Sequence, residues 1–270
     1  MFLLLNFLFK KKENTKQLKD KDTSTTSRRT KEQIATRKGE LGEYKINIQL
    51  DQLPKDYCYL SDLFVENPKA KSGYSQIDHL VITPYGIMVI ETKNYQGTIY
   101  GAKNQKNWLI NGKFKMGNPF VQNYGHIQAL KSLIDKKYHG LFISIVSFTK
   151  RCTFKVDLDY RKISSDELIV YDIELSEFIH RKISAMRTQY KEPLLNEHDI
   201  LILYNYFAKA NITEPKIREQ HNKILKSKNT EQATCEACNK PVSEKVKTYC
   251  LNNKKFKGKI YCFDHQNNHN

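Results

Sequence analysis

The segment QIDHLVITPYGIMVIETKNYQG, residues 76–97, holds two acids and a lysine among apolar residues: Asp78, Glu91 and Lys93. Runs rich in Val and Ile flank a proline and a glycine, so the segment predicts two antiparallel strands joined by a turn. Plain buried strands would carry apolar residues at these positions. The three side chains therefore mark a candidate site.

The length of the turn decides which charged residues meet. If Pro84 and Tyr85 form a two-residue loop, Asp78 lies opposite Glu91; if the loop is one residue further along, Asp78 lies opposite Lys93. Both registers place all three charged side chains on one face of the sheet, because positions 91 and 93 differ by two. A three-residue loop would remove this pairing.

Two carboxylates on one face are hard oxygen ligands for Mg²⁺ or Mn²⁺. A nearby lysine would hold a positive charge beside a phosphate, so the set suits metal-assisted phosphodiester hydrolysis. The alternative is that Glu91 and Lys93 are ordinary polar residues at the solvated end of a strand. The apolar run before them favours a site, since a charge that ends a buried strand commonly opens into a cleft.

A second set of candidate ligands lies near the C-terminus. Cys235-x-x-Cys238 and Cys262-x-x-His265 are separated by 23 residues, which is typical of a tetrahedral structural Zn²⁺ site. Cys250 lies midway and is the alternative to His265 as fourth ligand. The insert interleaves lysines with aromatic residues, which suits nucleic-acid binding or a small core. The tail resembles the zinc-ribbon and finger modules of DNA enzymes.

The elements that must position these residues alternate between helix and strand, which predicts an α/β core. A helical pattern runs from about residue 30 to Leu50, interrupted by Gly39 and Gly42. Strands are predicted at 57–66, in the hairpin, in a second hairpin around Asn111 and Gly112, at 140–149 as a central strand, and at 168–172. Further helices are predicted from residue 118, at 175–186 and at 196–211.

Several motifs occur in order: GELGE, QIDHLVITPYGIMVIETKNYQGTIYG, a tryptophan and NPFVQNYGHIQAL. Through them, residues 39 to about 137 resemble the nuclease-related domain (NERD) family, which is placed in the PD-(D/E)XK nuclease superfamily. The resemblance implies a restriction-endonuclease-like mixed sheet flanked by helices. It also implies a divalent-metal nuclease site.

Residue by residue, the resemblance makes Asp78 the metal-binding aspartate and Glu91 and Lys93 the E-x-K pair. Glu43 matches the acid of the first helix, and Glu40 is an equally near alternative. Gln122 matches the glutamine of the following helix, where its amide would orient substrate or the lysine.

Two further residues near these motifs are interpreted as structural. His126 shares a helical face with Gln122, because it follows four residues later, but a surface or packing histidine is the favoured interpretation. Trp108 could stack on a base, whereas a lone tryptophan beside a hairpin is more often a core residue.

Composition limits the class of partner. The 270 residues carry a formal net charge of +16, which favours nucleic acid or an anionic membrane surface, although lysine-rich composition alone could give the same charge. Clustered cysteines favour a metal site in a reducing compartment, hence a cytoplasmic protein. The apolar start MFLLLNFLF lacks the pattern of a signal peptide and is too short to span a bilayer. Peripheral membrane contact through residues 1–12 is the alternative to a loose start.

The predicted organisation has four parts: a short apolar start and polar tether at 1–29, a nuclease-like domain with a helical extension at 30–212, a linker or solvated helix at 213–234, and a zinc module at 235–270. The leading hypothesis is a Mg²⁺-dependent or Mn²⁺-dependent nuclease or nuclease-like DNA-processing protein. A non-catalytic nucleic-acid-binding scaffold and a membrane-surface protein are the alternatives. The sequence predicts no oligomeric state.

Overall fold

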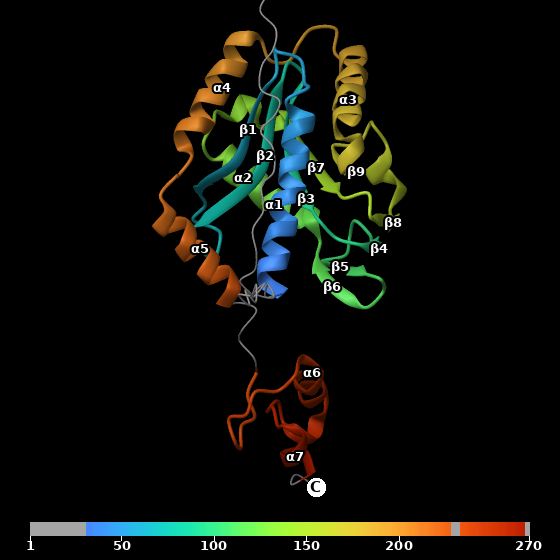
Figure 1. The fold of residues 1–270 in the computed structure, drawn as a ribbon, viewed down its shortest axis with the longest axis vertical. Coiled ribbons are helices and arrows are strands. Elements are labelled where there is room, and N and C mark those ends of the chain that lie inside the picture. The colour runs from blue at the N-terminus through green and yellow to red at the C-terminus, as the bar shows by residue number, and fades with distance from the viewer. Residues whose placement is uncertain (1–30, 228–232, 268–270) are drawn as a thin grey trace, which may run out of the picture.

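The computed structural model of the protein describes residues 31–227 and 233–267 (Figure 1). The predicted start and tether, with the proposed membrane contact, lie outside these residues. The main helices and strands, in chain order, are α1 (Lys31–Leu50), β1 (Cys58–Glu66), β2 (Tyr74–Thr83), β3 (Gly86–Lys93), β4 (Gly97–Gly101), β5 (Asn107–Ile110), β6 (Phe114–Gly117), α2 (Pro119–Lys131), β7 (Phe142–Phe148), β8 (Cys152–Val156), β9 (Glu167–Tyr171), α3 (Leu175–Gln189), α4 (Glu197–Ala210), α5 (Pro215–Ser227), α6 (Glu244–Asn252) and α7 (Phe263–Gln266). Short 3-10 helices are η1 (Lys136–Leu141), η2 (Leu158–Arg161), η3 (Asp172–Glu174) and η4 (Lys254–Phe256).

A five-stranded mixed sheet forms the centre of the main domain, in the order β1-β2-β3-β7-β9. The first three strands are antiparallel, and β3, β7 and β9 are parallel to one another. The apolar run predicted as a central strand is β7, because a strand covered on both faces needs apolar side chains in both directions. The predicted α/β fold with a mixed sheet is confirmed.

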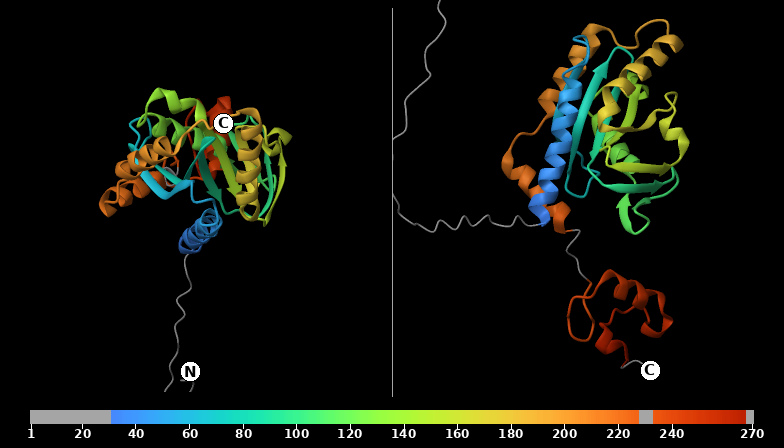
Figure 2. Two further views of the ribbon diagram at one scale, coloured as in Figure 1. Left: turned by 90° about the horizontal axis from the view of Figure 1, so that it is seen from above. Right: turned by 45° about the vertical axis from the view of Figure 1, so that its right-hand side comes forward.

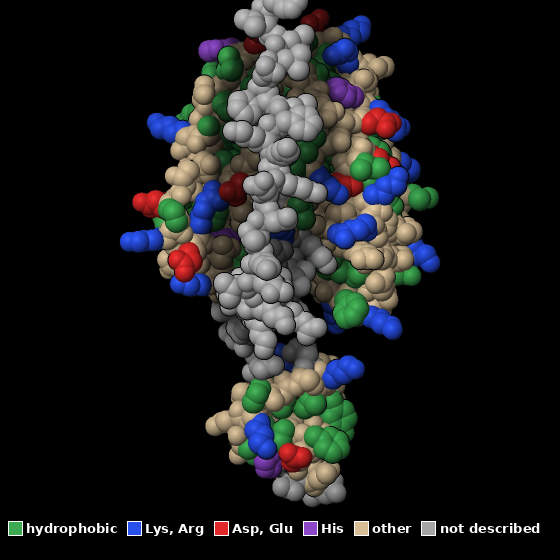
Figure 3. Space-filling model, in the orientation of Figure 1, with side chains coloured by type: hydrophobic (Ala, Val, Ile, Leu, Met, Phe, Trp, Pro, Cys, Tyr) green, Lys and Arg blue, Asp and Glu red, His purple; other side chains and the backbone are tan. Residues whose placement is uncertain are grey.

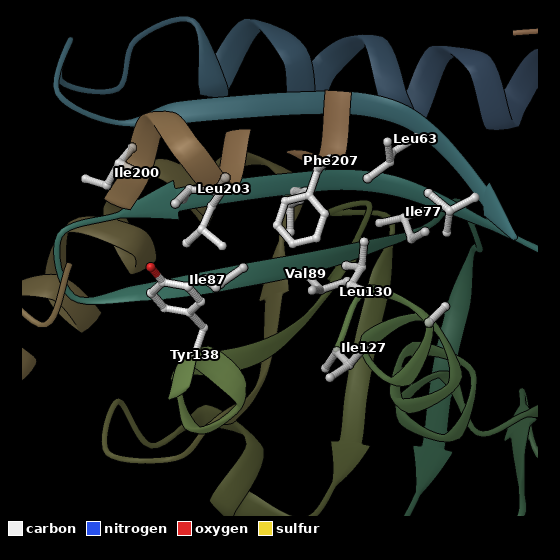
Figure 4. Close-up of a cluster of buried hydrophobic side chains, with 14 of the residues drawn as sticks. Leu63, Ile77, Ile87, Val89, Ile127, Leu130, Tyr138, Ile200, Leu203 and Phe207 are labelled. Atoms are coloured by element: carbon white, nitrogen blue, oxygen red, sulfur yellow. The ribbon is translucent and has the colours of Figure 1, made fainter. Parts of the chain in front are cut away.

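Helices cover both faces of this sheet (Figure 2). On one face, α2 and α4 bury Leu130, Leu203 and Phe207 against β1, β2 and β3 (Figure 4). On the other face, α1 and α3 bury residues such as Ile46 and Ile179 against β3, β7 and β9. Apolar area removed from water on both faces stabilises the layers at about 25 cal/mol per Å².

A second, four-stranded sheet has the order β6-β5-β4-β8. The hairpin β5–β6 turns at Asn111 and Gly112, whose φ angles of 53° and 68° are the left-handed values that an Asn-Gly turn favours. Trp108 is fully buried, and Phe120 and Tyr160 stack beside it, so the prediction of a core tryptophan is confirmed. Strands β4 and β8 were not predicted from the sequence.

The close approach of β4 to this tryptophan gives a stability prediction. A Cβ atom at Gly101 would lie 2.1 Å from Cδ2 of the Trp108 indole, so Gly101→Ala is expected to lower the free energy of unfolding by about 1–3 kcal/mol through overpacking. At Gly117, a Cβ atom would meet nothing within 4 Å, so Gly117→Ala is the matched control. Urea unfolding of the two variants measures the difference, and equal stabilities would contradict this packing.

The first half of the predicted linker forms α5, which packs on the main domain. Arg218 donates to Asp62 and to the carbonyl of Ile212. His221 is buried, with its ring edge against Phe64. The side chains that anchor α5 are polar, so the composition of this segment predicts a linker or a solvated helix. In the structure, α5 instead extends the main domain past residue 212.

Residues 233–267 form a small module with its own core of Cys235, Val242, Cys250, Phe256 and Tyr261. The insert between the two ligand pairs folds as α6 and η4, whereas a zinc ribbon would have strands there. Ser243 caps α6 by accepting from the backbone N–H of Val246. Across the described residues, no helix is long and apolar enough to cross a membrane.

Candidate nuclease site

The hairpin register brings the two acids together. Thr83 pairs with Gly86 and His79 with Ile90, so the loop is Pro84-Tyr85 and the next positions in the register are Asp78 and Glu91. This is the first of the two registers derived from the sequence. Oδ2 of Asp78 accepts the backbone N–H of Thr92 at 2.7 Å, which fixes the aspartate against the end of β3.

The alternation of side chains in β2 is broken just before Asp78. Ile77 and Leu80 pack in the same core cluster, although side chains three apart in a regular strand point to opposite faces. Asp78 lines the cavity on the α2 side and keeps the regular spacing of two with Leu80, so the break lies between Ile77 and Asp78. On the neighbouring strand, Asp62 has a left-handed φ of 53°, and pairing is interrupted opposite the aspartate. The register is the same on both sides of this interruption, so no residue is inserted there.

Glu91 and Lys93 are held by helix α2. Nζ of Lys93 donates to Oε1 of Glu91 at 2.5 Å and to Oε1 of Gln122 at 2.9 Å. The Gln122 amide also donates to Oε1 of Glu91 at 2.8 Å. The next residue, Asn123, is fully buried and donates to the Val89 carbonyl and the Ser144 hydroxyl, which fixes α2 on β3 and β7. The sequence-predicted Gln122 thus lies beside the E-x-K pair.

His126 also belongs to this cluster. Its Nε2 lies 3.3 Å from Oε2 of Glu91, and its side chain is 11% exposed. The sequence favoured a surface or packing histidine at this position. The sequence signal for a role at the site was its spacing of four residues from Gln122, which puts both on one helical face. The contact with Glu91 depends on how α2 crosses β3, which the sequence does not give.

Helix α1 brings the first predicted acid toward the pair. A Cβ atom at Gly42 would lie 3.3 Å from Cγ2 of Thr92, so this glycine permits a close approach of α1 to β3. Glu43 follows directly, and its charge is one of the causes that raise the pKa of Asp78. The side chain of the alternative, Glu40, lies outside the described part of the structure.

The two facing carboxyl groups differ in their pKa values. Burial and then the charge of Glu91 raise the pKa of Asp78 well above its ordinary value. Burial would also raise the pKa of Glu91, but Lys93 and His126 outweigh burial and lower it. Burial would lower the pKa of Lys93, but the charge of Glu91 outweighs burial and raises it. Lys93 is therefore a fixed positive charge.

The donor set fits a hard divalent cation. Oε2 of Glu91 is buried, and the described residues give it the ion pair with Nε2 of His126 at 3.3 Å but no regular hydrogen bond. A buried carboxylate oxygen with so little compensation favours a bound cation. Asp78 supplies a second carboxylate on the same face, and burial followed by the charge of Glu91 raises its pKa, so a cation would stabilise its ionised form.

A cavity of about 900 Å³ opens above this cluster. Asp78, Gln122 and His126 form part of its lining, and Asn67 and Ser72 from the β1–β2 connection form another part. A substrate in this cavity can therefore reach Asp78 from the α2 side of the sheet.

The C-terminal module holds a separate cluster. The ligand atoms of Cys235, Cys238, Cys262 and His265 all lie within 4.8 Å of one another. Sγ of Cys238 and Sγ of Cys262 are 3.7 Å apart, and a tetrahedral ion with bonds of about 2.3 Å separates sulfurs by roughly 3.8 Å. Cys250 lies outside this group and accepts the Tyr261 N–H in the small core. The cluster can therefore hold a metal ion.

The cluster favours a thiolate at Cys235, whereas hydrogen bonds from Cys235 and Cys262 help to raise the pKa of Cys238. Burial would raise the pKa of Cys235, but backbone N–H groups of Cys262, Ala237 and Cys238 outweigh burial and lower that pKa to about 6. A thiolate, rather than a thiol, is the form that binds zinc.

The fold and site together define a mixed α/β domain with an Asp, Glu-x-Lys constellation. The profile of the nuclease-related domain family, NERD, matches residues 38–149. An uncharacterized protein of Bacillus anthracis is 31% identical over 207 residues, which are 75% of this chain and 90% of that protein. The chain belongs to the NERD family. No solved structure gives a significant match.

Proposed function

We propose that the protein is a divalent-metal-dependent nuclease that hydrolyses phosphodiester bonds in DNA. The observation that carries the proposal is the position of Asp78 opposite Glu91 and beside Lys93, with Asp78 in the lining of a cavity open to solvent. A pure binding protein has no need for adjacent carboxylates, because they repel phosphate unless a cation lies between them. Membership of a nuclease-related family supports the same reaction class.

Each site residue has a role in this proposal. Asp78 and Glu91 would hold Mg²⁺ or Mn²⁺, and Glu43 would complete the shell or accept a proton from water. Such an ion, when bound, would activate water and neutralise charge that develops on the phosphate oxygens. Lys93 offsets negative charge at the phosphate, and Gln122 holds the lysine in position through its amide oxygen.

The C-terminal module has a structural role in the proposal. Cys235, Cys238, Cys262 and His265 bind one Zn²⁺, which stabilises residues 235–267. Lysines on this module then add contacts to the phosphate backbone. Residues 31–227 form the nuclease domain, in a protein of the cytoplasm.

A cleavage assay tests the nuclease. Purified protein is incubated with supercoiled plasmid, linear duplex and single-stranded DNA, in Mg²⁺, Mn²⁺ or EDTA. We expect metal-dependent cleavage that the Glu91→Ala, Lys93→Ala double variant lowers by about 10³-fold or more, since both the ligand and the charge are removed. The double substitution removes both members of the ion pair, so that neither charge is left buried alone.

A distinct result would favour the scaffold alternative. If neither protein cleaves any substrate and both bind DNA with the same dependence on salt, the chain is a non-catalytic nucleic-acid-binding protein. Plasmid nicking would indicate internal cleavage, and loss of linear DNA alone would indicate cleavage from ends.

A further inference from the structure

The cavity above the site has two chemically different walls. The α2 wall presents the side chains of Val121 and Tyr124, which are 58% and 63% exposed. The opposite wall, residues 67–72 of the β1–β2 connection, presents Lys69 and Lys71, which are both exposed. The α2 wall therefore combines an exposed aromatic ring with the polar side chains of Gln122, His126 and Gln128, and the connection carries the exposed lysines.

The α2 wall is recessed beside its aromatic residue. At Gly125, a Cβ atom would meet nothing within 4 Å, so open space adjoins Tyr124. An exposed aromatic ring next to an open recess offers a flat face on which a planar group can stack. In a single strand, every base has such a face available.

Helix α5 closes the groove on its far side and holds the basic wall in place. Nδ1 of His221 lies 2.8 Å from the Ser72 hydroxyl, which ties the helix to the connection that carries the two lysines. Leu225, one turn further along, adds an apolar surface that is 46% exposed. The groove is thus enclosed by α2, the connection and α5.

The site itself lies deep. The side chain of Glu91 is 4% exposed and that of Lys93 is 17% exposed. Asp78 and Gln122 line the cavity, and Gln122 contacts both Glu91 and Lys93, so a phosphate bound between the two walls lies next to this cluster. A single strand can place a phosphate there with its bases turned to one side and its phosphates to the other, whereas in a duplex the base faces are already stacked on their neighbours.

We propose that this groove binds single-stranded nucleic acid, with a base stacked on Tyr124 and phosphates on Lys69 and Lys71. The inference rests on the proposed function, because it assigns the substrate class of the same site. Charge alone does not single out the groove, since Lys and Arg side chains are spread over the visible face of the main domain (Figure 3). The groove is singled out by the exposed ring of Tyr124 on one wall together with the two lysines on the other.

Binding without turnover tests the groove separately from catalysis. Fluorescence anisotropy with labelled single-stranded DNA, single-stranded RNA and duplex DNA is measured on the full chain carrying Asp78→Asn. Adding Tyr124→Ala is expected to weaken single-strand binding roughly 5- to 150-fold, the contribution of one stacked base, while Tyr124→Phe retains binding. Tyr206→Ala, on α4, replaces a tyrosine that is 59% exposed outside the groove and is the matched control.

Two further variants test the other features of the groove. Lys69→Ala with Lys71→Ala is expected to reduce the slope of log affinity against log salt by about 1.4, since single strands give about 0.7 per phosphate contact. Gly125→Leu fills the recess and is expected to weaken single-strand binding, while the free energy of unfolding stays equal or rises. Lys191→Ala with Lys209→Ala, two exposed lysines outside the groove, is the charge control.

Photocrosslinking locates the bound strand on the full chain. A strand carrying 5-iodouracil is expected to crosslink within α2, residues 119–131. Crosslinks confined to residues 235–267, or unchanged single-strand affinity in the Tyr124→Ala and Gly125→Leu variants, would overturn the groove proposal. If the groove binds single strands but no substrate is cleaved, the nuclease proposal is wrong and the groove proposal stands. If substrate is cleaved but the groove variants have no effect, the groove proposal is wrong and the nuclease proposal stands.

Discussion

Asp78→Asn is expected to abolish cleavage and to make the metal-free protein more stable at neutral pH. The substitution removes a proposed metal ligand, so the proposed nuclease activity should fall by about 10³-fold or more. It also removes a negative charge that faces Glu91 across the hairpin, while an asparagine oxygen can still accept the Thr92 N–H. Loss of activity with a gain in stability is typical of a residue held for function at a structural cost.

The stability change has a predicted pH dependence. The pKa of Asp78 is raised in the folded protein, so its carboxyl group stabilises the fold only while protonated. That contribution is present below the ordinary pKa of an aspartate and is lost as pH rises through the folded value. Asparagine does not titrate, so the advantage of the variant should grow from mildly acidic to mildly alkaline pH.

Urea unfolding in EDTA measures this difference. The chain has one tryptophan, Trp108, which is fully buried in the main domain, so its fluorescence reports unfolding of that domain. Asp56→Asn, at an exposed aspartate in the turn before β1, controls for the loss of a carboxylate elsewhere in the main domain. If Asp78→Asn is less stable than the parent at every pH, the two carboxylates do not repel each other as the structure indicates.

Cys262→Ser is expected to release zinc and to unfold the C-terminal module while the main domain stays folded. Zinc binding supplies about 10–16 kcal/mol to small modules of this kind, far more than a core as small as that of residues 233–267 can supply. On the full chain, zinc content measures the loss of the ion, limited proteolysis measures unfolding of the module, and Trp108 fluorescence measures whether the main domain stays folded.

Cys250→Ala separates the two candidates for the fourth ligand. Cys250 is buried in the module core and lies outside the ligand cluster, so this variant should retain one zinc per chain, whereas His265→Ala should bind zinc more weakly. The opposite pattern would make Cys250 a ligand and remove His265 from the site.

The sequence could predict the centre of the candidate site because the hairpin is local. A two-residue turn allows two registers, and both put Asp78, Glu91 and Lys93 on one face of the sheet. The choice between the two registers comes from the structure, in which Thr83 pairs with Gly86. The left-handed residue Asp62 lies on another strand, and no local pattern marks the interrupted pairing opposite Asp78.

Features held by long-range or polar contacts were not predicted. Strands β4 and β8 are short and pair in parallel across about fifty residues of chain, so neither has a local signal of its own. A helix was one of the two alternatives for residues 213–234, but its packing on the main domain depends on Arg218 and His221, residues whose presence usually indicates a solvated segment. The contact between His126 and Glu91 depends on how α2 crosses β3, which no local pattern predicts.

The chemistry and the groove walls come from different segments of the chain. Glu91 and Lys93 lie on β3, which is paired with β2 on one side and β7 on the other. The basic wall and the closing helix are instead a surface connection and α5, which is near the end of the main domain. Changes in those outer segments can alter which substrates enter without moving the carboxylates. In evolutionary terms, substrate choice in this domain can diversify while the reaction is retained.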